Sequence, residues 1–90
     1  DPNNPRLQAA FFDLWNQSPR MAERFLRRLP QTLGGRELTV ENLVQARLNS
    51  CFDDNGRFTS TGLRNATRAE ADQRRRMEAM EAVLRARGVV

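Results

Sequence analysis

The chain has 90 residues, of which 39% are hydrophobic and 29% are charged, and its formal net charge at pH 7 is +4. This composition predicts a soluble, folded protein and excludes a disordered one, and the short length leaves room for a single compact core. No run approaches the roughly 18 apolar residues that a membrane-spanning helix needs. The first residues do not resemble a signal peptide and lack an initiator Met, so we expect residues 1–90 to be one domain that can belong to a longer protein.

The residue types that are missing exclude most catalytic chemistry. The sequence contains no His, which is the usual general base and the commonest metal ligand. Cys51 is the only cysteine, so it can form neither an internal disulfide nor a cysteine zinc site, and a reducing compartment is expected. The glycines match no phosphate-binding loop. We therefore expect no enzyme activity, no cofactor and no bound metal.

The first two predicted helices each start with a capping side chain followed by proline, at Asn4 and at Ser18. Apolar residues then recur at helical spacing in both segments. We expect the first helix to cover about residues 5–15. The second should begin at residue 19 and run for about three turns until Pro30, which lacks a backbone donor, ends it.

The third helix should start at Thr39, whose side chain can cap it after a loop that contains Gly34 and Gly35. Its apolar residues keep to one face as far as Cys51. The Asp-Asp-Asn-Gly sequence at 53–56 then indicates a turn. Neither flank alternates for long enough to make a strand, so we expect a tight corner between helices, with a short hairpin as the alternative.

The last helix has two candidate starts, one near Thr61 and one at Thr67, which opens a capping box with Glu70. It should end near Arg87, with Gly88 as a left-handed C-cap. Four helical segments joined by short loops predict an all-α fold, a compact bundle or array of about four helices.

The second predicted helix carries the most concentrated basic surface of the chain. Its four arginines fall within an arc of about 100° on a helical wheel. They are Arg20, Arg24, Arg27 and Arg28. Because a guanidinium can donate to two oxygens at once, this arginine ridge is a candidate site for an acidic protein partner or for a phosphate backbone. The simpler interpretation is a solvated helix face whose stems cover the core.

Two apolar features are candidates for further partner contacts. The first predicted helix has too many large side chains for one face, and Phe12 and Trp15 are either wrapped by the core or exposed as anchors for a partner. In the last helix a narrow apolar stripe contains the candidate contacts Met77, Met80 and Leu84 and continues toward the N-terminus through Gln73 and Ala69. Packing into the core is the default for this stripe, and a partner helix or a second copy of the chain is the alternative.

All fifteen basic residues are arginine, and none is lysine. Codon usage in a GC-rich genome is the plain explanation. The alternative is that lysine is avoided because it accepts ubiquitin. That alternative would suit an effector delivered into a eukaryotic host, or a viral accessory protein, and would place the chain in the host cytoplasm.

These observations favour a non-enzymatic protein-interaction domain, with an acidic or mixed partner surface meeting the arginine ridge and the apolar residues. The alternative is a small nucleic-acid-binding regulator of phage, plasmid or bacterial origin. A basic chain favours this alternative, but a net charge of only +4 with interleaved acids opposes it. Self-association through the last helix is a further hypothesis, and no membrane contact is expected.

Overall fold

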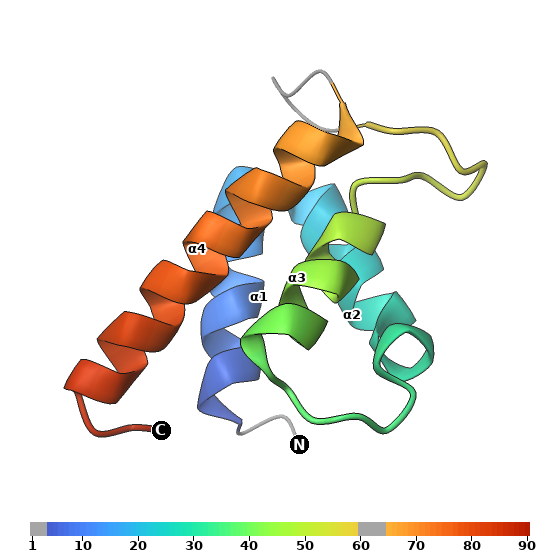
Figure 1. Ribbon diagram of the computed structural model, residues 1–90. Helices are drawn as coiled ribbons and strands as arrows, with labels where there is room; N and C mark the ends of the chain where they lie inside the picture. Colours follow the sequence, from blue (N-terminus) through green and yellow to red (C-terminus); the bar gives the residue numbers. More distant parts are fainter. Residues whose placement is uncertain (1–3, 60–64) are drawn as a thin grey trace.

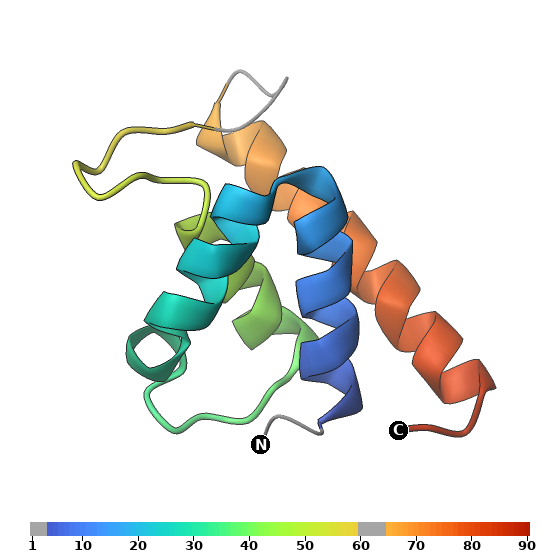
Figure 2. The same ribbon diagram turned by 180° about the vertical axis from the view of Figure 1, so that it is seen from behind.

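Four α-helices make up the fold of the computed structural model, which describes residues 4–59 and 65–90. Their bounds are α1 Pro5–Gln17, α2 Pro19–Leu33, α3 Val40–Asn49 and α4 Ala66–Ala86. Each helix packs against the next, and α4 closes the array by packing against α1 (Figure 1). Seen from behind, α1 and α2 lie side by side in front of α3 (Figure 2). The described residues contain no strand, so the predicted all-α array of four helices is confirmed.

The predicted caps of the first three helices are confirmed. The side chain of Asn4 accepts a hydrogen bond from the backbone of Arg6 at 2.9 Å, and the hydroxyl of Thr39 accepts one from Asn42 at 3.1 Å. Ser18 is both the C-cap of α1 and the N-cap of α2. Because this single extended residue joins the two helices, α1 continues to Gln17, two residues beyond its predicted end.

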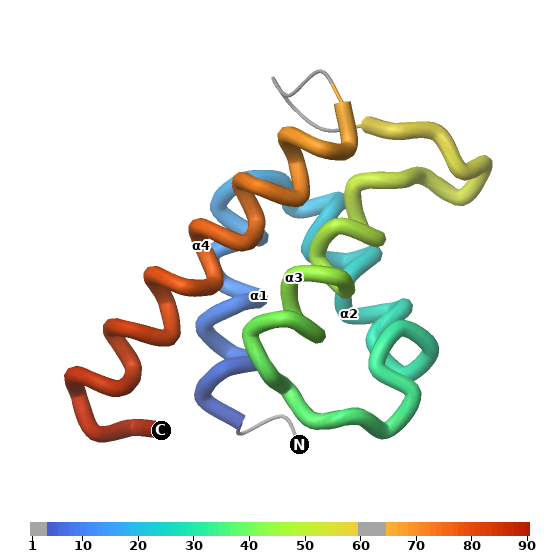
Figure 3. The backbone as a smooth tube through the Cα atoms, in the orientation of Figure 1, coloured from blue at the N-terminus to red at the C-terminus, as the bar shows by residue number. Residues whose placement is uncertain are grey.

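The prediction that Pro30 ends the second helix is wrong, because α2 continues to Leu33. Pro30 costs one backbone hydrogen bond, and Figure 3 shows the last turn of α2 bent out of line with the rest. The bent turn is held in other ways. Thr32 Oγ1 donates to the Arg28 carbonyl at 3.1 Å, Gly34 N donates to the Pro30 carbonyl at 3.1 Å, and the Leu33 side chain is buried.

The segment after α3 contains the turn that the sequence predicts, and we call residues 50–59 the corner. The Asp53 carboxylate accepts hydrogen bonds from the backbone of Asn55 and of Arg57, each at 2.9 Å, and so folds the turn.

The backbone on the two sides of this turn doubles back on itself. Phe52 and Phe58 form one isolated antiparallel bridge, with ring centroids 5.5 Å apart, and Thr59 N donates to the Cys51 carbonyl at 2.7 Å. The short hairpin, which the sequence offers as the alternative, therefore describes the corner better than a tight connection between helices, although the described residues form no strand.

The start of α4 corrects the sequence prediction. Asn65 is the N-cap, and its side chain accepts from the backbone of Arg68 at 2.9 Å. Thr67, the predicted cap, lies inside the first turn, because an Asn two residues earlier caps at least as well as Thr. The other candidate start, Thr61, lies outside the described residues. The C-cap of α4 is Arg87, and Gly88, which directly follows it, has the predicted left-handed conformation with φ +70°.

The core is formed by buried apolar side chains from all four helices. The largest fully buried ones are Leu14 of α1, Phe25 of α2, Leu43 and Val44 of α3, and Met77 of α4. Full burial of one such side chain contributes roughly 1.5–3 kcal/mol. Across residues 4–59 and 65–90, every helix is too short or too polar to cross a membrane.

A fully buried arginine, Arg47 of α3, lies at the centre of this core. Its guanidinium donates to Gln73 Oε1 of α4 at 2.6 Å, to Asp13 Oδ2 of α1 at 2.6 Å and to the Ala10 carbonyl at 3.3 Å. Burial lowers the pKa of this guanidinium, and the hydrogen bond with Asp13 opposes that shift. One side chain of α3 therefore fixes the positions of α1 and α4.

Candidate functional site

α1 buries one face and leaves aromatic side chains on the other. Ala10 and Leu14 are fully buried, whereas Phe12 is 64% exposed and Trp15 is 42% exposed. The half-buried ring of Phe11 lies between them, with its centroid 5.9 Å from that of Phe12 and 5.9 Å from that of Trp15. We call these three side chains the aromatic surface. The structure thus decides the open question about Phe12 and Trp15: both are exposed.

A groove adjoins the aromatic surface, between α1 and the C-terminal half of α4. It has a volume of about 420 Å³. Ala9 of α1 lines one wall, and Ala79 and Val83 of α4 line the other. Ala9 lies three residues before Phe12, so the two are neighbours on α1, although no residue of the aromatic surface itself lines the groove.

The predicted stripe on α4 divides between the core and this groove. Met77 is fully buried, with its sulfur 3.4 Å from a nitrogen of Arg47, so the folded chain cannot present Met77 to a partner. Met80 and Leu84 are only partly buried, and both line the groove. The physical reason is length: α3 has 10 residues and α4 has 21, so the last turns of α4 extend past α3 (Figure 1).

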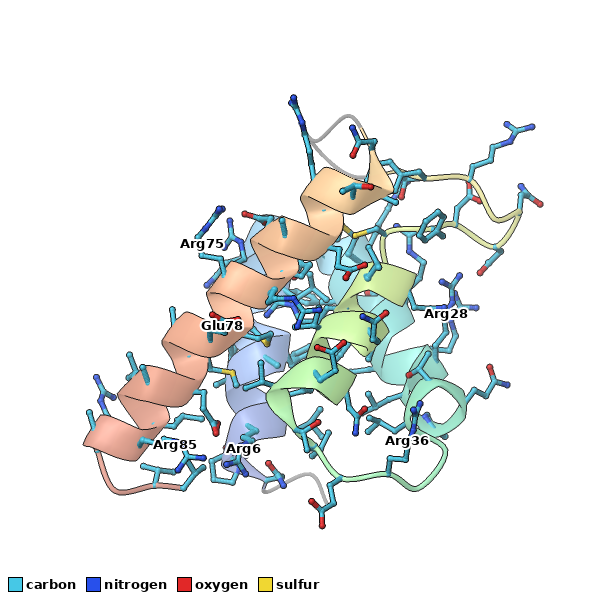
Figure 4. The ribbon with its side chains drawn as sticks, in the orientation of Figure 1. Arg6, Arg28, Arg36, Arg75, Glu78 and Arg85 are labelled. Atoms are coloured by element: carbon cyan, nitrogen blue, oxygen red, sulfur yellow. The ribbon has the colours of Figure 1, made fainter. Side chains whose placement is uncertain are left out.

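The predicted arginine ridge is used largely inside the molecule. Arg28 donates to the carbonyls of Asn49 and Phe52 at 3.0 and 2.8 Å, just after the end of α3. Figure 4 shows Arg28 on α2 beside the corner that follows α3. Arg28 and Arg27 both pair with Asp54, at 2.9 and 3.0 Å. These hydrogen bonds, with that of Arg28 the larger cause, hold the pKa of Asp54 below its ordinary value.

The other two ridge arginines differ from each other. Arg24 donates to Thr59 Oγ1 at 3.3 Å, so it too contacts the corner. Arg20 is exposed and forms no ion pair or hydrogen bond through its side chain in the described part of the chain. With Glu23 and Asp54 nearby, Arg20, Arg24 and Arg27 line a shallow depression. The four arginines therefore lie on one ridge as predicted, but three of them hold α2 onto residues 49–59.

Sequence reasoning missed the residues that turn the α4 stripe into a groove. In the sequence Ala9 and Ala79 are ordinary helix formers. In the structure their small side chains leave space between α1 and α4. Val83 could have been found from the sequence. It follows the apolar stripe but lies 100° from Leu84 on the helix, so it is a large apolar residue outside that stripe, as Phe12 is on the first helix. Arg87, at the end of the groove, read only as part of a charged helix end.

Among the described residues, no group of three His, Cys, Asp or Glu side chains is placed to hold a metal ion. The Cys51 thiol is buried, and desolvation raises its pKa, which disfavours the reactive thiolate.

No protein-family model, no curated protein and no solved structure matches this chain.

Proposed function

We propose that this chain is a non-enzymatic protein-interaction domain whose partner contacts the aromatic surface and the adjoining groove. The observation that carries the proposal is the exposure of two neighbouring large aromatic side chains, Phe12 at 64% and Trp15 at 42%. Small soluble proteins seldom leave large apolar side chains grouped on the surface without a binding role. Aromatic residues of this kind supply much of the binding energy in protein interfaces.

Two exposed arginines support an acidic or mixed partner. Arg87 lines the groove, and Arg20, on the first turn of α2, forms no ion pair in the described part of the chain. Charges at the edge of an apolar contact mainly set specificity and association rate. The absence of lysine is compatible with a host-delivered effector or a viral accessory protein, and this is the most specific form of the proposal.

The alternative, a nucleic-acid-binding regulator, receives less support. Such a protein needs guanidinium groups that are available to phosphates. Arg27 and Arg28 already pair with Asp54, and Arg24 contacts Thr59, so a phosphate backbone would compete with these intramolecular contacts.

Affinity capture from nuclease-treated extracts tests the proposed function. The baits are the original chain, the double variant Phe12→Ser/Trp15→Ser, and the control double variant Gln31→Ser/Gln45→Ser, whose sites are exposed on other parts of the molecule. We expect the original chain and the control to retain the same proteins, and the aromatic variant to lose them. Equal capture by all three baits would contradict the proposal, and so would capture that occurs only in extracts without nuclease treatment.

A further inference from the structure

The groove between α1 and α4 has the dimensions of a helix-binding site. Its α4 wall extends from Arg76 to Arg87, which is about 16 Å at the helical rise of 1.5 Å per residue. Two anchor residues seven positions apart on an incoming helix are about 10 Å apart, so both fit within this length. Met80 and Leu84 are partly buried and supply apolar lining.

The walls of the groove allow another backbone to approach closely. Ala9 on α1 and Ala79 on α4 carry only a methyl group, and Val83 projects from the rim with 49% of its surface exposed. Ridges of side chains on one helix pack into grooves of this kind between others. An extended peptide would instead need a sheet edge to pair with, and the described residues form no sheet.

The charges around the groove indicate which polar side chains a bound segment would carry beside its apolar anchor residues. Arg76 and Arg87 lie at opposite ends of the α4 wall. Arg76 already pairs with Asp72 at 2.9 Å and with Asp13 at 3.4 Å, and Asp13 also pairs with the buried Arg47. Arg87 is exposed and has no ion pair among the described residues, so Arg87 is the charge that an acidic side chain of an incoming segment would complement.

The same charges disfavour a second copy of this chain as the occupant. A second α4 would bring its own arginines, since its last turns again carry Arg85 and Arg87. Two chains of net charge +4 also repel each other.

We propose that the α1–α4 groove binds one amphipathic helix of a partner protein, with apolar residues at positions i, i+4 and i+7 in the groove and acidic residues beside them. The inference rests on the proposed function and specifies its partner. Anchors with this spacing are how an amphipathic helix occupies an apolar groove. A Glu or Asp side chain of the partner faces Arg87, at the C-terminal end of the α4 wall.

Fluorescence anisotropy with designed peptides tests the inference. The first peptide is a labelled helix of about 15 residues with Leu at i, i+4 and i+7 and Glu on both flanks. The second replaces Glu with Lys, and the third keeps the Glu composition but scatters the Leu residues around the helix. We expect the first peptide to bind more tightly than either of the others. Its advantage over the Lys peptide should shrink as salt is added.

Matched variants of α4 locate the binding. Val83→Asp places a charge in the groove, and Ala82→Asp places the same charge one residue away, on an exposed site outside the groove. We expect Val83→Asp to weaken the first peptide at least about tenfold and Ala82→Asp to change it little. Arg87→Gln should narrow the difference between the Glu and Lys peptides, whereas Arg68→Gln, the same change at the other end of α4, should not. Circular dichroism shows whether each variant is folded.

Four results would overturn the inference. They are no binding of the first peptide, equal binding of the scattered peptide, equal effects of Val83→Asp and Ala82→Asp, and a dimer of the chain alone in sedimentation that Val83→Asp dissociates. The last result would make a second copy the occupant. If the peptides fail while extract proteins are still lost from the Phe12→Ser/Trp15→Ser variant, the proposed function stands and only the helical partner is rejected.

Discussion

Arg47 and Asp13 form an ion pair of 2.6 Å in which the guanidinium is fully buried and the carboxylate is 38% exposed. Arg47 makes two more contacts, with Gln73 and with the Ala10 carbonyl, so its donors are distributed over α1 and α4. Removing one partner from such a group leaves a buried charge without compensation. The array is therefore expected to depend on Asp13 more than on any surface carboxylate.

Asp13→Asn should lower the free energy of unfolding by about 2–3 kcal/mol, less than the loss for a fully buried pair because Asp13 is half-exposed. Urea unfolding followed by circular dichroism measures this difference. Asp54→Asn is the control, since it removes a carboxylate that pairs with two arginines at an exposed site. The control should cost clearly less, because water screens the charges of this exposed pair. If both variants lose the same free energy of unfolding, the buried ion pair contributes no more to stability than the exposed one.

Arg47→Lys should also be destabilising, by about 1–3 kcal/mol, because an ammonium on a flexible stem cannot donate to Asp13, Gln73 and the Ala10 carbonyl in their present positions. Arg68→Lys should stay within about 0.5 kcal/mol, since Arg68 is exposed. Thermal unfolding of the two variants makes the comparison. If Arg47→Lys is as stable as the original chain, the geometry of the guanidinium is not what the core requires.

The exposed arginines allow a test of why lysine is missing. Arg75 and Arg85 have side chains that are 74% and 65% exposed, so Lys at either position should leave folding almost unchanged. If lysine is avoided to escape ubiquitin, the Arg75→Lys/Arg85→Lys variant should decay faster in eukaryotic cells after translation is stopped. A proteasome inhibitor should restore the original lifetime. Identical decay of the two proteins would favour codon usage instead.

Stability should fall in acid partly through Glu81. Hydrogen bonds from Arg6 at 2.7 and 2.9 Å lower the pKa of Glu81 below its ordinary value of 4.5. Because the unfolded chain takes up this proton at a higher pH than the folded chain, protonation favours unfolding. The contribution of Glu81 is complete above pH 4.5 and is lost as the pH falls through the lowered pKa. Glu81→Gln should therefore flatten the decline in this range, as measured by urea unfolding at stepped pH. An unchanged slope would contradict this assignment.

Local signals predicted well those features that depend on neighbouring residues. The caps at Asn4 and Ser18 and the left-handed Gly88 each involve contacts within one helical turn. Pro30 was misjudged because the burial of Leu33 and the bonds of the last turn offset a local penalty.

Features that depend on contacts between residues far apart in the chain could not be predicted from the sequence. Arg28 looked like one of four equal ridge residues until Asp54 and the end of α3 were placed beside it. Arg47 gave no signal at all, since only the packed array shows that it is buried between Asp13 and Gln73. The partial exposure of Met80 and the full burial of Met77 likewise follow from where α3 ends.

Ser18 is the single residue between α1 and α2, so the rotation of α2 about its own axis is fixed relative to that of α1. One inserted residue at this joint would turn all of α2 by about 100° about its axis. Arg27 and Arg28 would then face away from Asp54, and Phe25 would leave the core. The tip of the corner at Asn55 and Gly56 is exposed and has no such linkage, so extra residues there should be tolerated. Length variation in this chain is thus expected at the corner and forbidden at the joint.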